Sequence, residues 1–472
     1  MFVGREEQLG MLNKIYSTNS FEFLVLYGQR RIGKTTLLGE FIRTKEAIFF
    51  TAKEANDKMN LQGFTDCIID FFKLASGISF KSWQDAFEFI AKESGGKKTI
   101  IVFDEYPYAA LANKSLNSML QIAIDHTLKN TSIKLILSGS HVSFMENDVL
   151  GNKSPLYGRR TRAIQLKQFD YYEAGLMLEE YSSIDKIQFY SVLGGVPYYI
   201  SLVDKSLTFE ENLVDMFFRI DGKLFDEPFF LMREEFKEPA TYNSIIMAIA
   251  KGANRPHDIQ QVTGIDSNST PFYLKQLLDI GFIRKVIPFG ENPLKSKKGI
   301  YEIADNTFRF WYQYAYPNKS SIELGFGDVI AQTKVLPYLD DFIGKTVFES
   351  VSQQYLVRAS QKRLLPFTPT GIGKWWGNDK QEKKETDIDV ILESDKEVVL
   401  GECKWRESFP EIQDIDNLLD KKRLLPRYEK HHYAFFSKHP LSKKSSKYLR
   451  DAVKNPTYQI STDDLFHKMI NY

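Results

Sequence analysis

The segment that decides the fold is Gly28-Gln29-Arg30-Arg31-Ile32-Gly33-Lys34-Thr35. It fits the pattern G-x-x-x-x-G-K-[ST], follows an apolar run at residues 23–27 and precedes an apolar-periodic helix. In such a strand–loop–helix unit the glycines let backbone N–H groups surround phosphates at the positive end of the helix. The segment therefore predicts a phosphate-binding loop, or P-loop, in which Lys34 contacts the β- and γ-phosphates and Thr35 binds Mg²⁺.

The surrounding residues predict a parallel α/β sheet. Short apolar runs at 23–27, 47–51, 99–103 and 133–138 alternate with helical stretches. The third run is followed by Asp104-Glu105, so we expect Asp104 beside Mg²⁺ and Glu105 as the group that polarises the attacking water. A solvated strand end is the alternative interpretation of this acidic pair.

Composition limits the classes of function. The 472-residue chain is 43% hydrophobic, and 62 Lys+Arg against 61 Asp+Glu give a net charge of +1. Whole-chain charge therefore cannot attract nucleic acid, and any basic surface must be local. The two cysteines, Cys67 and Cys403, cannot form a disulfide framework. Because no run of about 18 apolar residues and no apolar signal segment is present, the sequence predicts a cytoplasmic protein without a membrane partner.

A winged helix is predicted between the P-loop region and the C-terminal region. Three short helical segments lead into a hairpin that ends near residue 303, and the polar stretch 316–321 marks a boundary. The third helix, at 267–278, presents polar side chains and a single lysine, Lys275. The residues leave DNA contact and a packing role equally open.

Further segments resemble the archaeal-type ATPases of the STAND branch of AAA-related P-loop proteins. They are Phe2-Val3-Gly4-Arg5-Glu6, Leu137-Ser138-Gly139-Ser140, Pro155-Leu156-Tyr157-Gly158-Arg159-Arg160-Thr161 and Gly194-Gly195-Val196-Pro197-Tyr198-Tyr199. The resemblance covers residues 1 to about 240 and implies ATP and Mg²⁺ as cofactors. The nucleotide-binding residues expected from motif and resemblance are Gly28, Gly33, Lys34, Thr35, Thr36, Asp104, Arg5, Ser138, Arg159 and Pro197.

Two assignments within this resemblance stay open. The resemblance implies that Ser138 or Ser140 is a polar sensor and that Arg159 or Arg160 contacts phosphate. Taken alone, two adjacent arginines after a Tyr-Gly turn also fit a solvated charged face.

The C-terminal region carries a second acidic constellation. Residues 386–392 and 398–405 predict two adjacent strands joined by a turn at 393–396. Residues two apart on a strand share a face, so Glu402 and Lys404 project together, and Asp389 can converge with Glu402 on one divalent cation. Two carboxylates and a lysine suit metal-dependent phosphodiester hydrolysis. A hairpin with exposed alternating charge gives the same pattern, and the residues alone leave both interpretations open.

These residues also resemble the D…E-x-K core of the PD-(D/E)xK nuclease superfamily. The resemblance rests on Asp389, Glu402-Cys403-Lys404 and the helical Glu349. The flanking Lys374-Trp375-Trp376-Gly377 and Gly401-Glu402-Cys403-Lys404-Trp405-Arg406 resemble the version fused to archaeal-type ATPases. The resemblance covers about residues 320–472 and implies catalytic roles for Asp389, Glu402, Lys404 and Glu349, with Asp389 and Glu402 as metal ligands. Asp387 shares a face with Asp389, which is favoured because it directly precedes the apolar run.

The sequence predicts an α/β fold for both the N-terminal and the C-terminal part of the chain. We expect a P-loop NTPase domain with a parallel sheet at 1–168, a helical lid at 169–238, a winged helix at 239–318 and a restriction-endonuclease-like α/β domain at 319–472. Residues 421–454 carry 11 Lys/Arg against two Asp/Glu, which predicts either a nucleic-acid contact or a solvated face.

The expected function is an ATP-binding and ATP-hydrolysing switch that controls DNA binding or cleavage by the nuclease-like domain. Homo-oligomerisation on ATP binding is one expected consequence. The first alternative is a regulatory ATPase whose nuclease-like domain is inactive and only binds DNA or a protein partner. The second is a signalling or scaffold ATPase that oligomerises through the winged helix.

Overall fold

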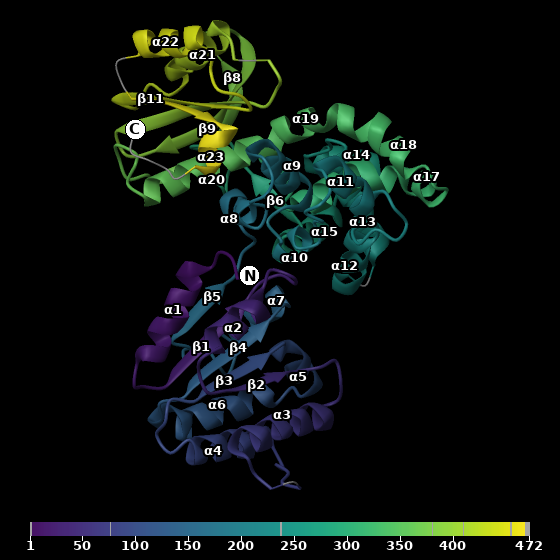
Figure 1. Ribbon diagram of the computed structural model, residues 1–472, viewed down its shortest axis with the longest axis vertical. Coiled ribbons are helices and arrows are strands. Elements are labelled where there is room, and N and C mark those ends of the chain that lie inside the picture. Colours follow the sequence, from purple (N-terminus) through teal and green to yellow (C-terminus); the bar gives the residue numbers. More distant parts are fainter. Residues whose placement is uncertain are drawn as a thin grey trace. The chain divides into compact units, whose positions relative to one another are not determined.

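The computed structural model describes residues 2–75, 77–236, 238–379, 381–408, 410–453 and 456–467 (Figure 1). The chain forms two compact units. The first is Met1–Phe169 with Val196–Tyr198, and the second is Asp170–Gly195 with Tyr199–Tyr472. The first unit holds a five-stranded sheet, and the second holds a five-stranded and a two-stranded sheet.

The sheet of the first unit is parallel, with strand order β2-β3-β4-β1-β5. Its strands are β1 (Glu22–Tyr27), β2 (Ala47–Thr51), β3 (Ile100–Asp104), β4 (Lys134–Gly139) and β5 (Arg162–Gln165). Every residue of β3 and β4 is buried, which confirms the predicted parallel sheet covered on both faces.

The two faces of this sheet are covered by different helices. Leu24 and Leu26 of β1 pack with α1 (Glu6–Ser17) and α2 (Lys34–Ile42). Phe23 and Val25 point to the opposite face because successive side chains of a strand alternate. That face is covered by α3 (Asp57–Phe72), α4 (Trp83–Glu93), α5 (Tyr106–Ala112) and α6 (Leu116–His126). The carboxyl end of β1 therefore opens into the P-loop between two packed layers.

The second unit begins with helices. These are α8 (Tyr171–Leu176), α9 (Ser183–Leu193), α10 (Pro197–Ile200), which starts in the first unit, α11 (Phe209–Phe217) and α12 (Glu227–Glu235). Thr208 caps α11 and forms a capping box with Glu211, which satisfies backbone N–H groups at the helix start.

Three helices and a hairpin follow in the order that the sequence predicts. They are α13 (Pro239–Ala250), α14 (Pro256–Thr263), α15 (Thr270–Ile280) and the antiparallel strands β6 (Ile283–Val286) and β7 (Ile300–Ile303). The polar stretch at 316–321 is helical and lies in a run of helical segments from α16 (Asn306–Phe310) to α20 (Phe348–Gln361). Here the Asn318 side chain donates to the backbone carbonyl of Tyr314 four residues earlier, and Lys319 pairs with the distant Asp226, so a local and a tertiary contact together outweigh the loop-like composition.

The C-terminal sheet has strand order β12-β11-β10-β9-β8. Its strands are β8 (Gly371–Asp379), β9 (Lys384–Glu393), β10 (Glu397–Lys404), β11 (Lys430–Ser437) and β12 (Thr457–Ser461). The first three form an antiparallel meander, whereas β10, β11 and β12 run parallel. Helix α21 (Ile412–Asp420) provides the crossover between β10 and β11.

Helices cover both faces of the C-terminal sheet. Ile415 and Leu418 of α21 and Leu449 of α22 (Lys443–Ala452) pack on Leu400 and Phe435. Helix α20 contacts β9 and β10, with the Cys403 thiol 3.3 Å from the Ser352 hydroxyl. These contacts place the Glu402-Cys403-Lys404 strand end between two helical layers.

Candidate functional site

The P-loop conformation depends on its two glycines. Gly28 has φ +151°, and a Cβ built there would lie 2.3 Å from the carbonyl oxygen of Leu166. Gly33 has φ +86° and directly precedes α2. The loop therefore ends at a helix N-terminus, where backbone N–H groups and the helix dipole favour anions.

Lys34 is the buried cation of the loop. Its Nζ donates to the carbonyl oxygens of Gly28 at 2.9 Å and Gln29 at 2.8 Å. Burial lowers the pKa of Lys34 to about 8, although Glu105 and Asp104 oppose the shift. A phosphate group bound here would offer the ammonium a stronger acceptor than these carbonyls.

Thr35 and Asp104 meet as the sequence predicts. The Thr35 hydroxyl donates to Oδ2 of Asp104 at 2.9 Å, and Asp104 is buried. The other carboxylate oxygen of Asp104 is buried without a hydrogen-bond partner. An unpartnered carboxylate oxygen beside a threonine hydroxyl is a donor set that suits Mg²⁺. Thr36 follows in the first turn of α2 and is exposed.

Glu105 and the end of β4 form the next part of this site. Glu105 has φ +48°, and its Oε2 accepts a hydrogen bond from the Ser140 hydroxyl at 2.7 Å. Ser138 is fully buried and its hydroxyl has no partner. The structure thus anchors Glu105 at the carboxyl ends of adjacent strands β3 and β4 through Ser140.

Arg5 and the Pro197 segment also lie with the P-loop unit. The Arg5 guanidinium is buried, donates to the carbonyl oxygen of Lys167 at 2.5 Å and that of Ile32 at 3.3 Å, and stacks 4.4 Å from the Phe169 ring. Pro197 opens α10, and Arg31 of the P-loop lies 5.0 Å from the Tyr198 ring.

Arg159 is not brought to the P-loop. It precedes β5, which runs parallel to β1, so it lies at the amino end of the strands while the loop lies at the carboxyl end. Its guanidinium forms two hydrogen bonds with Asp125, at 2.9 and 2.7 Å. Arg160 is exposed and likewise precedes β5; burial and Glu146 raise the pKa of Tyr27, and Arg160 opposes that rise.

The C-terminal carboxylates lie on neighbouring strands. Val390 of β9 pairs with Gly401 of β10, and Asp389 and Glu402 are the next residues on the two strands. Oδ2 of Asp389 accepts a hydrogen bond from the backbone N–H of Cys403 at 2.8 Å. Burial and the nearby Glu402 raise the pKa of Asp389 to about 7.

Glu402 is held by two lysines. Its Oε1 accepts from Lys404 at 2.5 Å, and its Oε2 accepts from Lys421 at 2.8 Å. Burial raises the pKa of Glu402, but Lys421 and Lys404 outweigh burial and lower it overall. Lys421 follows α21 directly and was not selected from the sequence as a site residue. The sequence feature that could have indicated Lys421 is its position at the start of the lysine-rich segment 421–454.

Glu349 of α20 lies near Asp389 and is paired with Lys374 of β8. Nζ of Lys374 lies 3.6 Å from Glu349 and 3.0 Å from Glu302 of β7. Burial raises the pKa of Glu349 to about 8, with Lys374 opposing the shift. A pocket of about 260 Å³ is lined by Glu349, Lys374, Asp387 and Asp389. The structure therefore places Glu349 and Asp389 in one pocket, with Glu402 near enough to Asp389 to raise its pKa, but within the described ranges no three His, Cys, Asp or Glu side chains form a metal-binding cluster.

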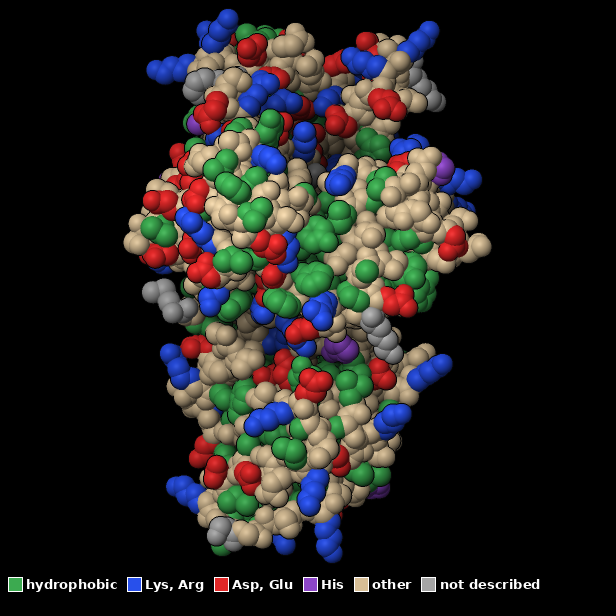
Figure 2. Space-filling model, turned by 90° about the vertical axis from the view of Figure 1, so that its right-hand side faces the viewer, with side chains coloured by type: hydrophobic (Ala, Val, Ile, Leu, Met, Phe, Trp, Pro, Cys, Tyr) green, Lys and Arg blue, Asp and Glu red, His purple; other side chains and the backbone are tan. Residues whose placement is uncertain are grey.

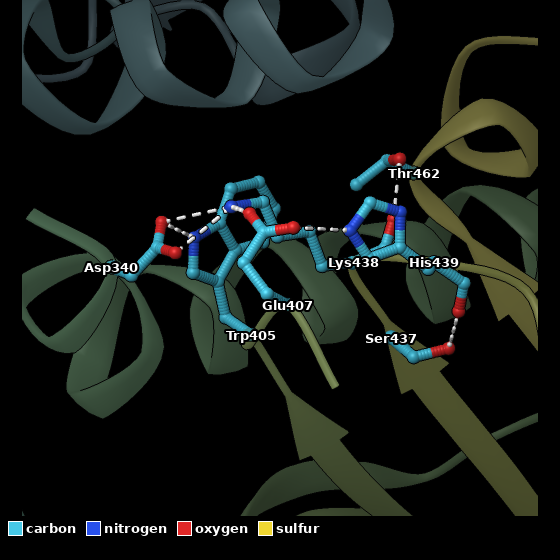
Figure 3. Close-up of polar contacts among 7 residues, drawn as sticks. All are labelled: Asp340, Trp405, Glu407, Ser437, Lys438, His439 and Thr462. Atoms are coloured by element: carbon cyan, nitrogen blue, oxygen red, sulfur yellow. Dashed lines mark hydrogen bonds and ion pairs between the residues drawn. The ribbon is translucent and has the colours of Figure 1, made fainter. Parts of the chain in front are cut away.

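A polar cluster fixes the chain just beyond Lys404 (Figure 3). Lys438 is buried at the end of β11 and lies 2.9 Å from Asp340, and it also pairs with Glu407. The indole N–H of Trp405 donates to the same Asp340 at 2.8 Å, and His439 lies 3.1 Å from Glu407. These contacts hold the segment after β10 against α19 (Leu339–Phe342).

Part of the lysine-rich segment 421–454 is paired with acids elsewhere in the chain. Arg423 pairs with Asp379, Arg427 with Glu393 and Lys430 with Glu397. On the face drawn in Figure 2, blue basic and red acidic side chains are mixed and form no single basic surface. Lys454 lies outside the described residues. Within the part of the chain that the structure describes, no helix combines the length and apolar character needed to cross a membrane.

The P-loop, its paired Thr35 and Asp104 and the five-stranded parallel sheet define the first unit as a P-loop ATPase domain. Residues 2–203 match a family described as an ATPase domain predominantly from Archaea. Residues 311–415 match a second family, described as "Archaea bacterial proteins of unknown function".

A relative of nearly full length extends this match. The chain is 34% identical over 453 residues to an uncharacterised protein of Methanocaldococcus jannaschii, which covers 94% of this chain and 97% of that protein. An uncharacterised ATP-binding protein of the same organism is 41% identical over 46 residues, covering 10% of this chain and 78% of that protein. The chain belongs to this archaeal-type ATPase family.

The solved structures that resemble this chain have lower sequence identity to it than the relative of nearly full length. The Walker-type ATPase of Pyrococcus abyssi is 20% identical and covers 66% of this chain and 96% of its own, with a TM-score of 0.49. The ORC2 protein of Aeropyrum pernix is 14% identical and covers 70% of this chain and 94% of its own, with a TM-score of 0.44. The family assignment therefore depends on the sequence matches.

Proposed function

We propose that the chain is an ATP-hydrolysing switch that controls a metal-dependent, DNA-directed nuclease domain at its C-terminus. The observation that carries this proposal is that Asp389 of β9 accepts a hydrogen bond from the N–H of Cys403, next to Glu402 of β10, with Lys404 on Glu402 and Glu349 in the pocket of Asp389. Buried acids with a neighbouring lysine can hold a divalent cation and a scissile phosphate together.

The ATPase half uses residues grouped at the carboxyl ends of β1, β3 and β4. Lys34 binds the β- and γ-phosphates, and Thr35 and Asp104 hold Mg²⁺. A bound Mg²⁺ neutralises phosphate charge and orients the triphosphate. Glu105, anchored by Ser140, accepts the proton of the attacking water.

The remaining nucleotide contacts in this proposal are less direct. Arg5 borders the nucleotide base, Ser138 serves as the polar sensor and Pro197 contacts the nucleotide from α10. Arg159 has no part in the proposal, because its guanidinium is committed to Asp125 at the other end of the sheet. The proposal includes homo-oligomerisation on ATP binding.

The order of helices and strands supports a winged helix and a restriction-endonuclease-like domain in the rest of the chain. Three helices followed by an antiparallel hairpin suit a winged helix at 239–318, whose α15 contacts DNA. The order α20-β8-β9-β10-α21-β11, with an antiparallel meander and one parallel crossover, suits a restriction-endonuclease-like domain within 319–472. Helices α8 to α12 form the lid region at 169–238.

A second candidate function is favoured by the ion pairs around Glu402. Both of its oxygens accept hydrogen bonds from lysines, which already neutralise its charge, so a divalent cation competes with two ammonium groups for this carboxylate. This arrangement suits a domain that binds a polynucleotide or a protein partner without cutting it. The ATPase would then regulate binding alone.

The test is metal-dependent cleavage of single-stranded, duplex and branched DNA and RNA, with and without ATP. We expect Lys404→Ala to abolish cleavage and Lys34→Ala to abolish its response to ATP. Matched controls are Lys396→Ala, in the exposed turn between β9 and β10, and Lys58→Ala, exposed on α3; both should behave as the parent. Absence of cleavage with Mg²⁺ or Mn²⁺ while ATP hydrolysis persists would select the second candidate.

A further inference from the structure

A large cavity lies beside the carboxylate pocket in the second unit. It has a volume of about 820 Å³ and is bordered by the turn after α13, by β7 and by the helical run from α16 to α19. This volume is in the range that encloses small ligands, and it holds a few unstacked nucleotides but not a base-paired duplex.

The lining of the cavity carries more cations than acids, since Lys251, Arg309, Lys334 and Lys345 outnumber Glu302 and Asp341. Lys251, Lys334 and Lys345 border it, and all three are exposed. Lys334 donates to the Asn318 amide oxygen at 3.0 Å, and Lys345 lies 3.9 Å from Asp341, too long for a hydrogen bond. Three ammonium groups around one opening suit a phosphodiester backbone, which releases counterions on binding.

The cavity also offers groups that recognise bases. Asn254 and Gln313 supply amides, which can donate to and accept from base edges. The Tyr338 side chain is 57% exposed at the opening, and Tyr314 lies behind it with its hydroxyl near the Tyr338 carbonyl. An exposed aromatic ring is a stacking platform for an unpaired base.

The cavity adjoins the proposed catalytic pocket. Asn254 lines both, and its carbonyl oxygen accepts a hydrogen bond from the backbone N–H of Tyr301 at 2.7 Å. Glu302 lines the large cavity and pairs with Lys374, which lines the carboxylate pocket. Arg255 is exposed beside this junction and adds a cation.

We propose that this cavity binds a single-stranded polynucleotide segment and leads it past Asn254 to the pocket of Asp389 and Glu349. The inference deepens the proposed nuclease function and rests on it for the direction of the strand. Lysines contact the phosphates, amides contact base edges and Tyr338 stacks on a base. The winged helix then packs beside the strand path through Asn254 and Arg255, in addition to any duplex contact of α15.

Binding is measured by fluorescence anisotropy with a labelled 15-nucleotide single strand and a hairpin duplex, using the full chain in EDTA. Chelation removes cleavage from the assay, so the result does not depend on nuclease activity. We expect the single strand to bind more tightly than the duplex. The triple variant Lys251→Gln, Lys334→Gln, Lys345→Gln should weaken single-strand binding about tenfold or more and reduce the salt slope by about 2, at about 0.7 per phosphate contact.

The matched control is the triple variant Lys81→Gln, Lys97→Gln, Lys114→Gln, which makes the same charge change at exposed positions of the first unit. It should bind as the parent does, and both variants should keep the parental unfolding midpoint. Equal weakening in both triple variants, or tighter binding of the duplex that Lys275→Gln alone abolishes, would overturn the proposal.

Crosslinking locates the strand independently of affinity. A single strand with photoreactive thymidines should crosslink to peptides containing residues 313–345, and crosslinks confined to 267–278 would overturn the proposal. Failure of the two proposals is distinguishable. Single-strand binding that the lysine triple variant weakens, without any cleavage, would support the cavity assignment and contradict the nuclease proposal. Cleavage that the triple variant leaves unchanged would support the nuclease proposal and contradict the cavity assignment.

Discussion

Nζ of Lys421 lies 2.8 Å from Oε2 of Glu402, so the helical turn after α21 supplies a second lysine to a carboxylate already bound by Lys404. The Lys421 side chain is 13% exposed and that of Glu402 is 8% exposed. A charge-assisted hydrogen bond in this setting is only weakly screened by water.

Lys421→Ala should therefore lower the free energy of unfolding by about 2 kcal/mol, because Glu402 loses one of two charged partners. Lys422→Ala, at the exposed neighbouring position, should change it by less than about 0.5 kcal/mol. Urea denaturation of the three proteins measures both values. Equal losses for the two variants would contradict a specific contact between Lys421 and Glu402.

Ser140→Ala should reduce kcat for ATP hydrolysis about tenfold with little change in ATP affinity, because the Ser140 hydroxyl positions Glu105. Ser140→Thr keeps a hydroxyl and should restore most of the rate. Steady-state kinetics and nucleotide titration separate the two effects. A loss of affinity that matches the loss of rate would show that Ser140 supports binding and not the position of Glu105.

The stability contributed by Glu302 should depend on pH. Burial raises the pKa of Glu302, but Lys374 and Arg284 outweigh burial and lower it from 4.5 to about 2. A carboxyl whose folded pKa is lowered stabilises the fold above its unfolded pKa and loses that effect as pH falls through the folded pKa. The difference between the parent and Glu302→Gln should thus be about 3 kcal/mol above pH 5, from 1.36 kcal/mol per pKa unit, and should shrink below pH 4.5.

Chemical denaturation at several pH values between 3 and 7 measures this difference. Glu323→Gln, at an exposed helical position, serves as the control and should give a small difference that does not vary with pH. A Glu302→Gln difference that is constant across this range would refute the role of the ion pairs.

Lys438→Met should destabilise the C-terminal sheet by about 2 kcal/mol. The substitution leaves Asp340 and Glu407 without their shared cation, and the partial exposure of both acids keeps the loss below the 3–5 kcal/mol of a fully buried pair. Lys444→Met, exposed on α22, is the matched control. Thermal and urea unfolding compare them, and a Lys438→Met protein as stable as the control would rule out a structural role for the cluster in Figure 3.

Much of the fold was predictable because its signals are local. The apolar runs matched β1 to β4 within one or two residues, and the P-loop motif sits between β1 and α2. The two adjacent strands predicted around the turn at 393–396 are β9 and β10. The pairing of Thr35 with Asp104 was likewise expected from the motif and the strand end.

What failed or was missed involves partners far apart in the chain. Arg159 pairs with Asp125 because strand direction places it at the end of the sheet opposite the P-loop. Lys374 pairs with Glu302, 72 positions away, because the hairpin of β6 and β7 packs on β8. No local pattern encodes such neighbours.

The sequence by itself determined the P-loop, the parallel sheet around it and the acids of the C-terminal strands, because motif spacing and side-chain periodicity are properties of short segments. Only the tertiary structure decided which cations neutralise those acids. In the tertiary structure Glu402 pairs with Lys404 and Lys421, and Lys374 lies between Glu349 and Glu302 and pairs with both. The physical reason is that a buried charge without a partner has a high desolvation cost, so these acids lie within a few ångströms of cations. The packing of distant segments determines which cations those are.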